Sequence, residues 1–114
     1  MKRDEFNASE VLPQLNNNTT LLNKLLVSFL ETIPGDISTM QIAVEAGDKE
    51  RLAKVAHKIK PSVSILIGGS LLAVLKELEI NKGKSDLELK KVMSVFQNEV
   101  SLLTNEIRTY LSQN

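Results

Sequence analysis

The only histidine of the chain, His57, lies in a segment that could support chemistry at its ring. Residues 56–62 read AHKIKPS. A neutral imidazole nitrogen is a good nucleophile near neutral pH, because the ordinary pKa of the ring is about 6.5. A phosphoryl group in transit carries negative charge on its oxygens, which nearby ammonium groups stabilise. Lys60 follows His57 by one helical turn and Lys54 precedes it by nearly one turn, so the spacing favours phosphoryl chemistry.

The hydrophobic pattern around His57 predicts a helix that exposes the imidazole to solvent. At about 100° of rotation per residue, His57 lies about 140° from the centre of the apolar arc. The arc consists of Leu52, Ala56, Ile59, Val63 and Leu66. Lys58 points to another side of the helix and is the weaker candidate for stabilising a phosphoryl group. Small or compact residues near the histidine leave room for a partner protein: Ala53, Pro61, Ser64 and Gly68.

Four long helices, preceded by a short one, are predicted to hold this segment. The expected ranges are 8–15, 19–46, 49–67, 71–80 and from 86 to about 111. Expected N-caps are Asn7, Thr19 or Thr20, Asp48, Ser70 and, within a capping box, Ser85. Short loops between long helices imply antiparallel neighbours. The predicted fold class is therefore all-α: an antiparallel up-down-up-down four-helix bundle with a short N-terminal helix, forming one domain over residues 1–114.

Glycine and proline mark the expected bends and ends. Pro34-Gly35 predicts that the range 19–46 is a bent helix or two helices in near alignment, and Pro61 predicts a bend beside His57, whose carbonyl loses its helical hydrogen bond. Gly47 and Gly68-Gly69 are expected helix stops. A turn at Gly68-Gly69 would bring residues near 79–81 level with His57. Glu79 could then accept a hydrogen bond from the imidazole and fix its tautomer.

Composition argues against several functions. Lys and Arg balance Asp and Glu at 14 each, which argues against nucleic acid as the main partner. The absence of cysteine excludes disulfides and thiolate metal sites and fits a cytoplasmic protein. With one histidine and no Gly-rich phosphate loop, neither a metal nor another cofactor is expected. No signal peptide and no run of about 18 apolar residues is found, so membrane insertion is not expected.

The sequence around His57 resembles that of histidine-containing phosphotransfer (HPt) domains. The resemblance runs over about residues 21–79 and rests on the segment 56–62, on Leu66 and Gly68, and on the sequence KELE at 76–79. Upstream, FLE at 29–31 with Pro34, and AGD at 46–48, also fit the family pattern. The chain departs from that pattern at Pro61 and at Ile67, where the family has glycine.

The resemblance implies a phosphocarrier of two-component signalling, acting in a multistep His-Asp phosphorelay. His57 would accept a phosphoryl group from the aspartate of one receiver domain and pass it to the aspartate of another. Lys60 matches the family lysine that steadies the phosphoryl group. Partners would be response-regulator receiver domains and a hybrid or other sensor histidine kinase. The domain would be a transfer intermediate rather than an enzyme, without an ATP site of its own.

The docking surface expected for a receiver surrounds the histidine. Its predicted members are Ala53, Lys54, Lys58, Pro61, Ser64, Ile65 and Gly68. Ile65 and Ile67 are expected to be exposed, and the lysines would complement an acidic receiver site. Two alternatives stay open: an unphosphorylated helical adaptor that binds a receiver or kinase domain, and a hydrolase with His57 as general base. A lone histidine is also often only a solvated surface residue.

Overall fold

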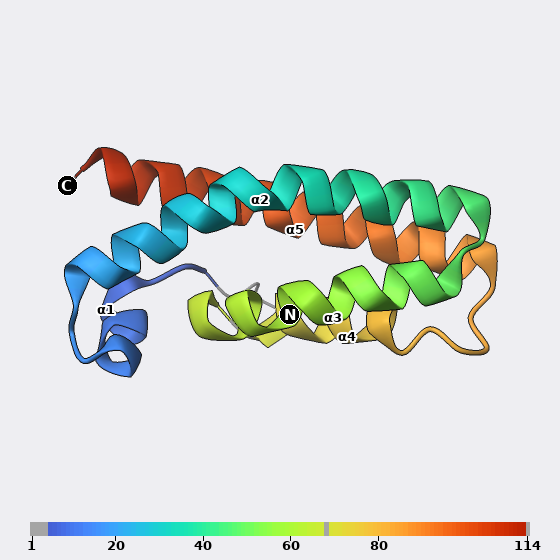
Figure 1. Ribbon diagram of the computed structural model, residues 1–114, viewed down its shortest axis with the longest axis horizontal. Helices are drawn as coiled ribbons and strands as arrows, with labels where there is room; N and C mark the ends of the chain where they lie inside the picture. The colour runs from blue at the N-terminus through green and yellow to red at the C-terminus, as the bar shows by residue number, and fades with distance from the viewer. Residues whose placement is uncertain (1–4, 68, 114) are drawn as a thin grey trace.

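The computed structural model is a bundle of four long helices with a short helical segment packed at one end (Figure 1). The structure describes residues 5–67 and 69–113. Its elements are α1 (Ala8–Val11), the 3-10 helix η1 (Leu12–Leu15), α2 (Thr19–Ala46), α3 (Lys49–Leu66), α4 (Gly69–Glu79) and α5 (Asp86–Ser112). The described residues contain no strand. The predicted fold class is confirmed.

Each long helix packs against two others, in the cyclic order α2, α3, α4, α5. The core between them is built from Leu, Ile, Val, Met and Phe side chains, and Phe96 of α5 is fully buried in it. On α3 the buried residues are the five of the predicted apolar arc: Leu52, Ala56, Ile59, Val63 and Leu66. Because burying an apolar side chain contributes about 1.5–3 kcal/mol, this arc fixes which face of α3 points outward.

Helix α2 continues without interruption from Thr19 to Ala46, with Pro34 inside it. The alternative of two separate helices is therefore wrong. Helix α3 likewise continues through Pro61. Proline removes one helical hydrogen bond in each case, but packing against the neighbouring helices outweighs that loss.

The predicted caps are correct at three helix starts and wrong at two. Asn7, Asp48 and Ser85 cap α1, α3 and α5 as expected, with the full capping box at Ser85. Asn18, rather than Thr19 or Thr20, caps α2 by accepting a hydrogen bond from the N–H of Leu21.

The turn between α3 and α4 also differs from the prediction. Gly69 is the first residue of α4 rather than a helix stop, and Ser70 lies inside that helix. The Ser70 hydroxyl donates a hydrogen bond to Glu99 of α5 at 2.9 Å, so it joins two helices instead of capping one. Gly68 lies outside the described residues. Gly47 ends α2 as predicted, in the left-handed conformation with φ of 70°.

The N-terminal segment begins with a shorter α-helix than predicted. The α-helical part of the range 8–15 ends at Val11, and Leu12–Leu15 continues as the 3-10 helix η1. Pro13 lies in the first turn of η1, where its missing N–H does least harm. Val11 is buried in the core, so this segment is anchored to the bundle.

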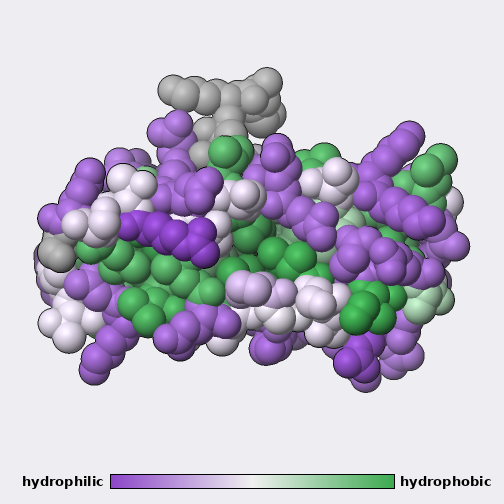
Figure 2. Space-filling model, turned by 90° about the horizontal axis from the view of Figure 1, so that it is seen from above, coloured by the Kyte–Doolittle hydropathy of each residue, from purple (hydrophilic) through white to green (hydrophobic). Residues whose placement is uncertain are grey.

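The face of the bundle that Figure 2 shows carries many hydrophilic side chains, with apolar patches between them. The exposed large apolar residues of α2 and α5 are Leu21, Val27, Ile42, Leu87, Val95 and Leu102. Isolated exposed apolar residues are normal on folded proteins and need no special account.

Candidate functional site

His57 lies on the outward face of α3, and its side chain is 74% exposed. This is the position that the helical pattern predicts. Its neighbour Ala56 is fully buried, and His57 is rotated about 100° from it on the helix, toward α4. The imidazole is therefore open to solvent and to a partner protein, while its backbone belongs to the packed bundle.

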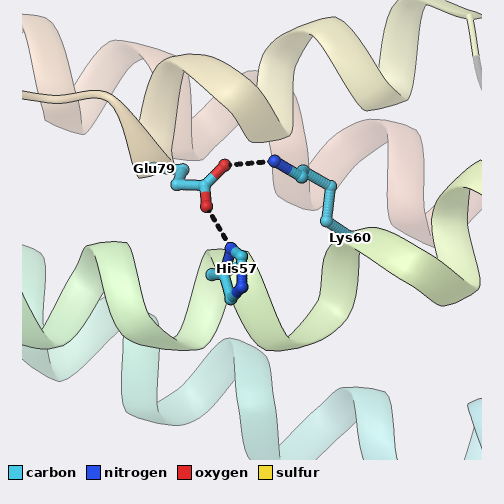
Figure 3. A network of polar contacts seen from close by, with 3 residues as sticks. All are labelled: His57, Lys60 and Glu79. Carbon is cyan, nitrogen blue, oxygen red and sulfur yellow. Dashed lines mark hydrogen bonds and ion pairs between the residues drawn. The ribbon is translucent and has the colours of Figure 1, made fainter.

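The carboxylate of Glu79, at the end of α4, lies between His57 and Lys60 of α3 (Figure 3). Its Oε2 is 2.5 Å from Nδ1 of His57, and its Oε1 accepts a hydrogen bond from Nζ of Lys60 at 2.7 Å. The side chain of Glu79 is only 16% exposed. The structure thus contains the contact between His57 and Glu79 that an antiparallel turn after α3 leads one to expect.

The electrostatics of this network keep Glu79 ionised. The hydrogen bond from Lys60, and next that from His57, lower the pKa of the Glu79 carboxyl, and they outweigh partial burial, which acts in the opposite direction. An ionised carboxylate can only accept hydrogen bonds. Nδ1 of His57 is therefore the donor toward Glu79, and in the neutral ring Nε2 keeps its lone pair. Nε2 is the nitrogen available for nucleophilic attack.

The chain following α4 fixes the register that places Glu79 opposite His57. Asn81 is buried, and its amide nitrogen donates hydrogen bonds to the carbonyls of Lys49 at 3.0 Å and Leu78 at 2.9 Å. Nζ of Lys49 donates to the carbonyl of Lys84 at 2.5 Å. These contacts join the end of α4 and the following loop to the first turn of α3. Sequence reasoning missed Asn81, although a polar residue at the end of an apolar helix was the available signal.

The two other lysines of the predicted surface have separate ion-pair partners. Lys54 is 76% exposed and lies 3.7 Å from Glu50, one turn earlier on α3. Lys58 binds Asp36 of α2 at 2.9 Å, so it is directed toward α2 and away from the side of α3 that faces α4. The structure therefore joins Lys60, but not Lys58, to the histidine network.

The small residues predicted near the imidazole lie on α3 within two turns of it, but the two isoleucines do not form an exposed surface. Pro61 and Ser64 are exposed and Ala53 is half-buried. Ile65 and Ile67 are also half-buried and pack against the core, which corrects the expectation that both are exposed. The reason is the N-terminal segment: Glu10, Val11 and Gln14 line a small cavity together with residues 64–67. Gly68 lies outside the described residues.

Two further features bear on the kind of site. Within residues 5–67 and 69–113, no group of three or more His, Asp or Glu side chains could hold a metal ion. None of the helices in this part of the chain combines the length and hydrophobicity needed to cross a membrane.

Comparison with known proteins identifies the fold. Neither the models of known protein families nor the curated protein sequences gave a match. Among solved structures, the chain is similar to the HPT domain from the Hpt sensor hybrid histidine kinase from Shewanella, with a TM-score of 0.81. The match covers 96% of this chain and 95% of that one, at 20% sequence identity. The chain therefore has the fold of a histidine-containing phosphotransfer domain.

Proposed function

We propose that this protein carries a phosphoryl group on Nε2 of His57 within a multistep His-Asp phosphorelay. The observation that carries the proposal is the position of Glu79, which occupies Nδ1 and leaves Nε2 of a largely exposed ring as the nucleophile. The likeness to the HPT domain of a hybrid histidine kinase supports the fold needed for this role.

The transfer step balances without an added proton acceptor. The lone pair of Nε2 attacks the phosphorus of an aspartyl phosphate on a receiver domain. The N–P bond forms while the P–O bond to the aspartate breaks, and the electron pair of that bond leaves with the aspartate carboxylate. The hydrogen on Nδ1 stays in place, so the phosphorylated ring carries a positive charge. The Glu79 carboxylate, at hydrogen-bond distance, balances that charge. Transfer to a second receiver is the reverse reaction.

Lys60 is the cation best placed to stabilise the phosphoryl oxygens. It lies one turn after His57 on the same side of α3, and its ammonium group is held by Glu79 at 2.7 Å. The carboxylate thus holds both the imidazole and the ammonium group in fixed positions before the phosphoryl group arrives. Such preorganised charges stabilise the transition state without reorganisation during the reaction.

The partners in this proposal are receiver domains and a hybrid or other sensor histidine kinase in the cytoplasm. The kinase supplies the ATP chemistry, and this domain acts as a transfer intermediate rather than an enzyme. Receiver docking around His57 would involve Ala53, Lys54, Pro61 and Ser64.

Transfer from a labelled receiver tests the proposal. Receiver domains of hybrid histidine kinases are charged with radiolabelled acetyl phosphate and incubated with the wild-type chain and with His57→Gln. We expect an acid-labile, alkali-stable label on the wild type and none on the variant. Because His57 is exposed, the variant should keep the circular dichroism spectrum of the bundle. A label that persists in His57→Gln would refute the assignment. A folded wild type that binds a receiver without accepting phosphate would favour the adaptor function instead.

A further inference from the structure

Ile80 is a large apolar side chain that the bundle leaves in solvent beside the histidine network. It follows Glu79 directly, and it is 71% exposed, the highest value among the exposed large apolar residues of the described chain. Exposure alone does not make a site. The position of Ile80 relative to His57 is what distinguishes it.

Two contacts between α3 and the end of α4 fix that position. Glu79 binds His57, and Asn81 binds the carbonyl of Lys49, so Ile80 lies in the chain between the two residues that touch α3. The backbone of Ile80 is therefore held beside the contact between Glu79 and His57, at the end of α4 that lies against the first half of α3. The opposite side of the imidazole, toward Ile65, is where the N-terminal segment packs.

Charges of both signs lie near Ile80, but the two acidic residues, Glu77 and Glu79, are paired with basic side chains. Lys76 precedes Ile80 by one helical turn, and its backbone carbonyl accepts a hydrogen bond from the N–H of Ile80 at 2.8 Å. Lys82 follows it by two residues. In the described part of the chain, neither Lys76 nor Lys82 forms an ion pair, whereas Lys54 across the face is paired with Glu50. An apolar side chain between two unpaired ammonium groups suits a partner with an apolar contact beside an anionic centre.

We propose that Ile80 is the apolar anchor for the receiver domain, with Lys76 and Lys82 as its electrostatic rim. The inference rests on the proposed function and gives it a specificity-determining residue. A phosphorylated receiver is the occupant that fits, because an aspartyl phosphate carries the negative charge that the lysines would attract, and because it must approach His57 directly. Ile80 takes the place that the sequence pattern had assigned to Ile65.

The test compares Ile80→Ser with the matched control Ile42→Ser. Ile42 is the same residue type and 62% exposed, but it lies on α2, outside the face of α3 and α4. From a panel of receiver domains charged with acetyl phosphate, the one that labels the wild type fastest is used. The second-order rate constant of transfer is then measured for all three proteins. Labelling by phosphoramidate, a small donor that needs no docking, is measured in parallel.

The expected result is specific to the receiver as donor. Ile80→Ser should slow transfer from the receiver by about tenfold, the loss expected when a contact worth about 1.4 kcal/mol disappears. Ile42→Ser should change the rate by less than about twofold, and both variants should react with phosphoramidate like the wild type.

Four results would overturn the inference. Transfer to Ile80→Ser at the wild-type rate, or an equal loss in Ile42→Ser, would show that Ile80 does not anchor the receiver. Equal slowing with phosphoramidate would show that the substitution disturbs the histidine rather than docking. If phosphoramidate labels His57 in the wild type but no receiver does, the relay function itself fails, and the anchor with it.

Discussion

Replacing Glu79 by Gln should destabilise the domain at neutral pH and should do so less as the pH falls. The substitution keeps the size of the side chain but removes the charge that Lys60 and His57 share. The lowered pKa of Glu79 means that the folded protein holds this carboxylate ionised more strongly than the unfolded chain does. Its contribution to stability is therefore present above the ordinary pKa, near 4.5, and is lost as the pH falls through the lower pKa of the folded state.

The magnitude follows from the two contacts and their exposure. A hydrogen bond to a charged group contributes about 1.5–3 kcal/mol when it is shielded from water. Here Glu79 is 16% exposed but its partners are more open, at 31% for Lys60 and 74% for His57, so solvent screening reduces each contribution. We expect Glu79→Gln to lower the free energy of unfolding by about 1–2 kcal/mol near neutral pH, equivalent to a Tm about 4–8 °C lower.

Urea denaturation followed by circular dichroism measures this difference at a series of pH values from about 7 to about 3. Glu77→Gln is the matched control, because it makes the same change two residues earlier on α4. Glu77 is 53% exposed and lies 3.9 Å from Lys84, so its substitution should cost less than about 0.5 kcal/mol at any pH in that range. A loss in Glu79→Gln that matches the control near pH 7, or that does not shrink in acid, would refute the reasoning.

Three further substitutions test other parts of the structure. Lys60→Gln should slow phosphoryl transfer to His57 by roughly tenfold to hundredfold, since it removes the cation that binds the same carboxylate as the imidazole. Lys58→Gln, whose lysine is bound to Asp36, should change the rate much less, and equal effects in the labelling kinetics would show that the assignment of Lys60 is wrong. Asn81→Ala should lower the free energy of unfolding by about 1–3 kcal/mol, because two carbonyls lose a buried donor, and an unchanged urea midpoint would contradict this. Pro61→Ala restores the N–H that can bond to the carbonyl of His57 and should raise the free energy of unfolding by about 1–3 kcal/mol; a lower urea midpoint would indicate that proline is the better residue there.

The helices and their buried faces could be predicted from the sequence because they depend on local periodicity. The apolar arc of α3 is the clearest case, since its five residues are the ones that the structure buries. The arc also placed His57 in solvent. Helix starts were harder where several good caps are adjacent. Asn18, Thr19 and Thr20 are all favourable N-cap residues. Asn16 and Asn17 before them have left-handed backbone conformations, and the helix that follows this turn has Asn18 as its N-cap.

Contacts between distant segments explain what the sequence could not indicate. Ile65 lies on the polar side of the α3 pattern, yet Glu10 and its neighbours line a small cavity together with it, and a helical wheel contains no information about such a segment. The pairing of Glu79 with His57 could be expected only from a turn of assumed length. Its register depends on Asn81, whose hydrogen bond reaches the start of α3, 32 residues away in the sequence.

The most direct test of the account is to identify which imidazole nitrogen carries the phosphoryl group. The chain, labelled with ¹⁵N, is phosphorylated by a charged receiver domain and studied by NMR through the ring nitrogens and the attached phosphorus. The account predicts a single phosphorylated residue, His57, with phosphorus on Nε2 and hydrogen retained on Nδ1. Phosphorus on Nδ1, or on any residue other than His57, would contradict it.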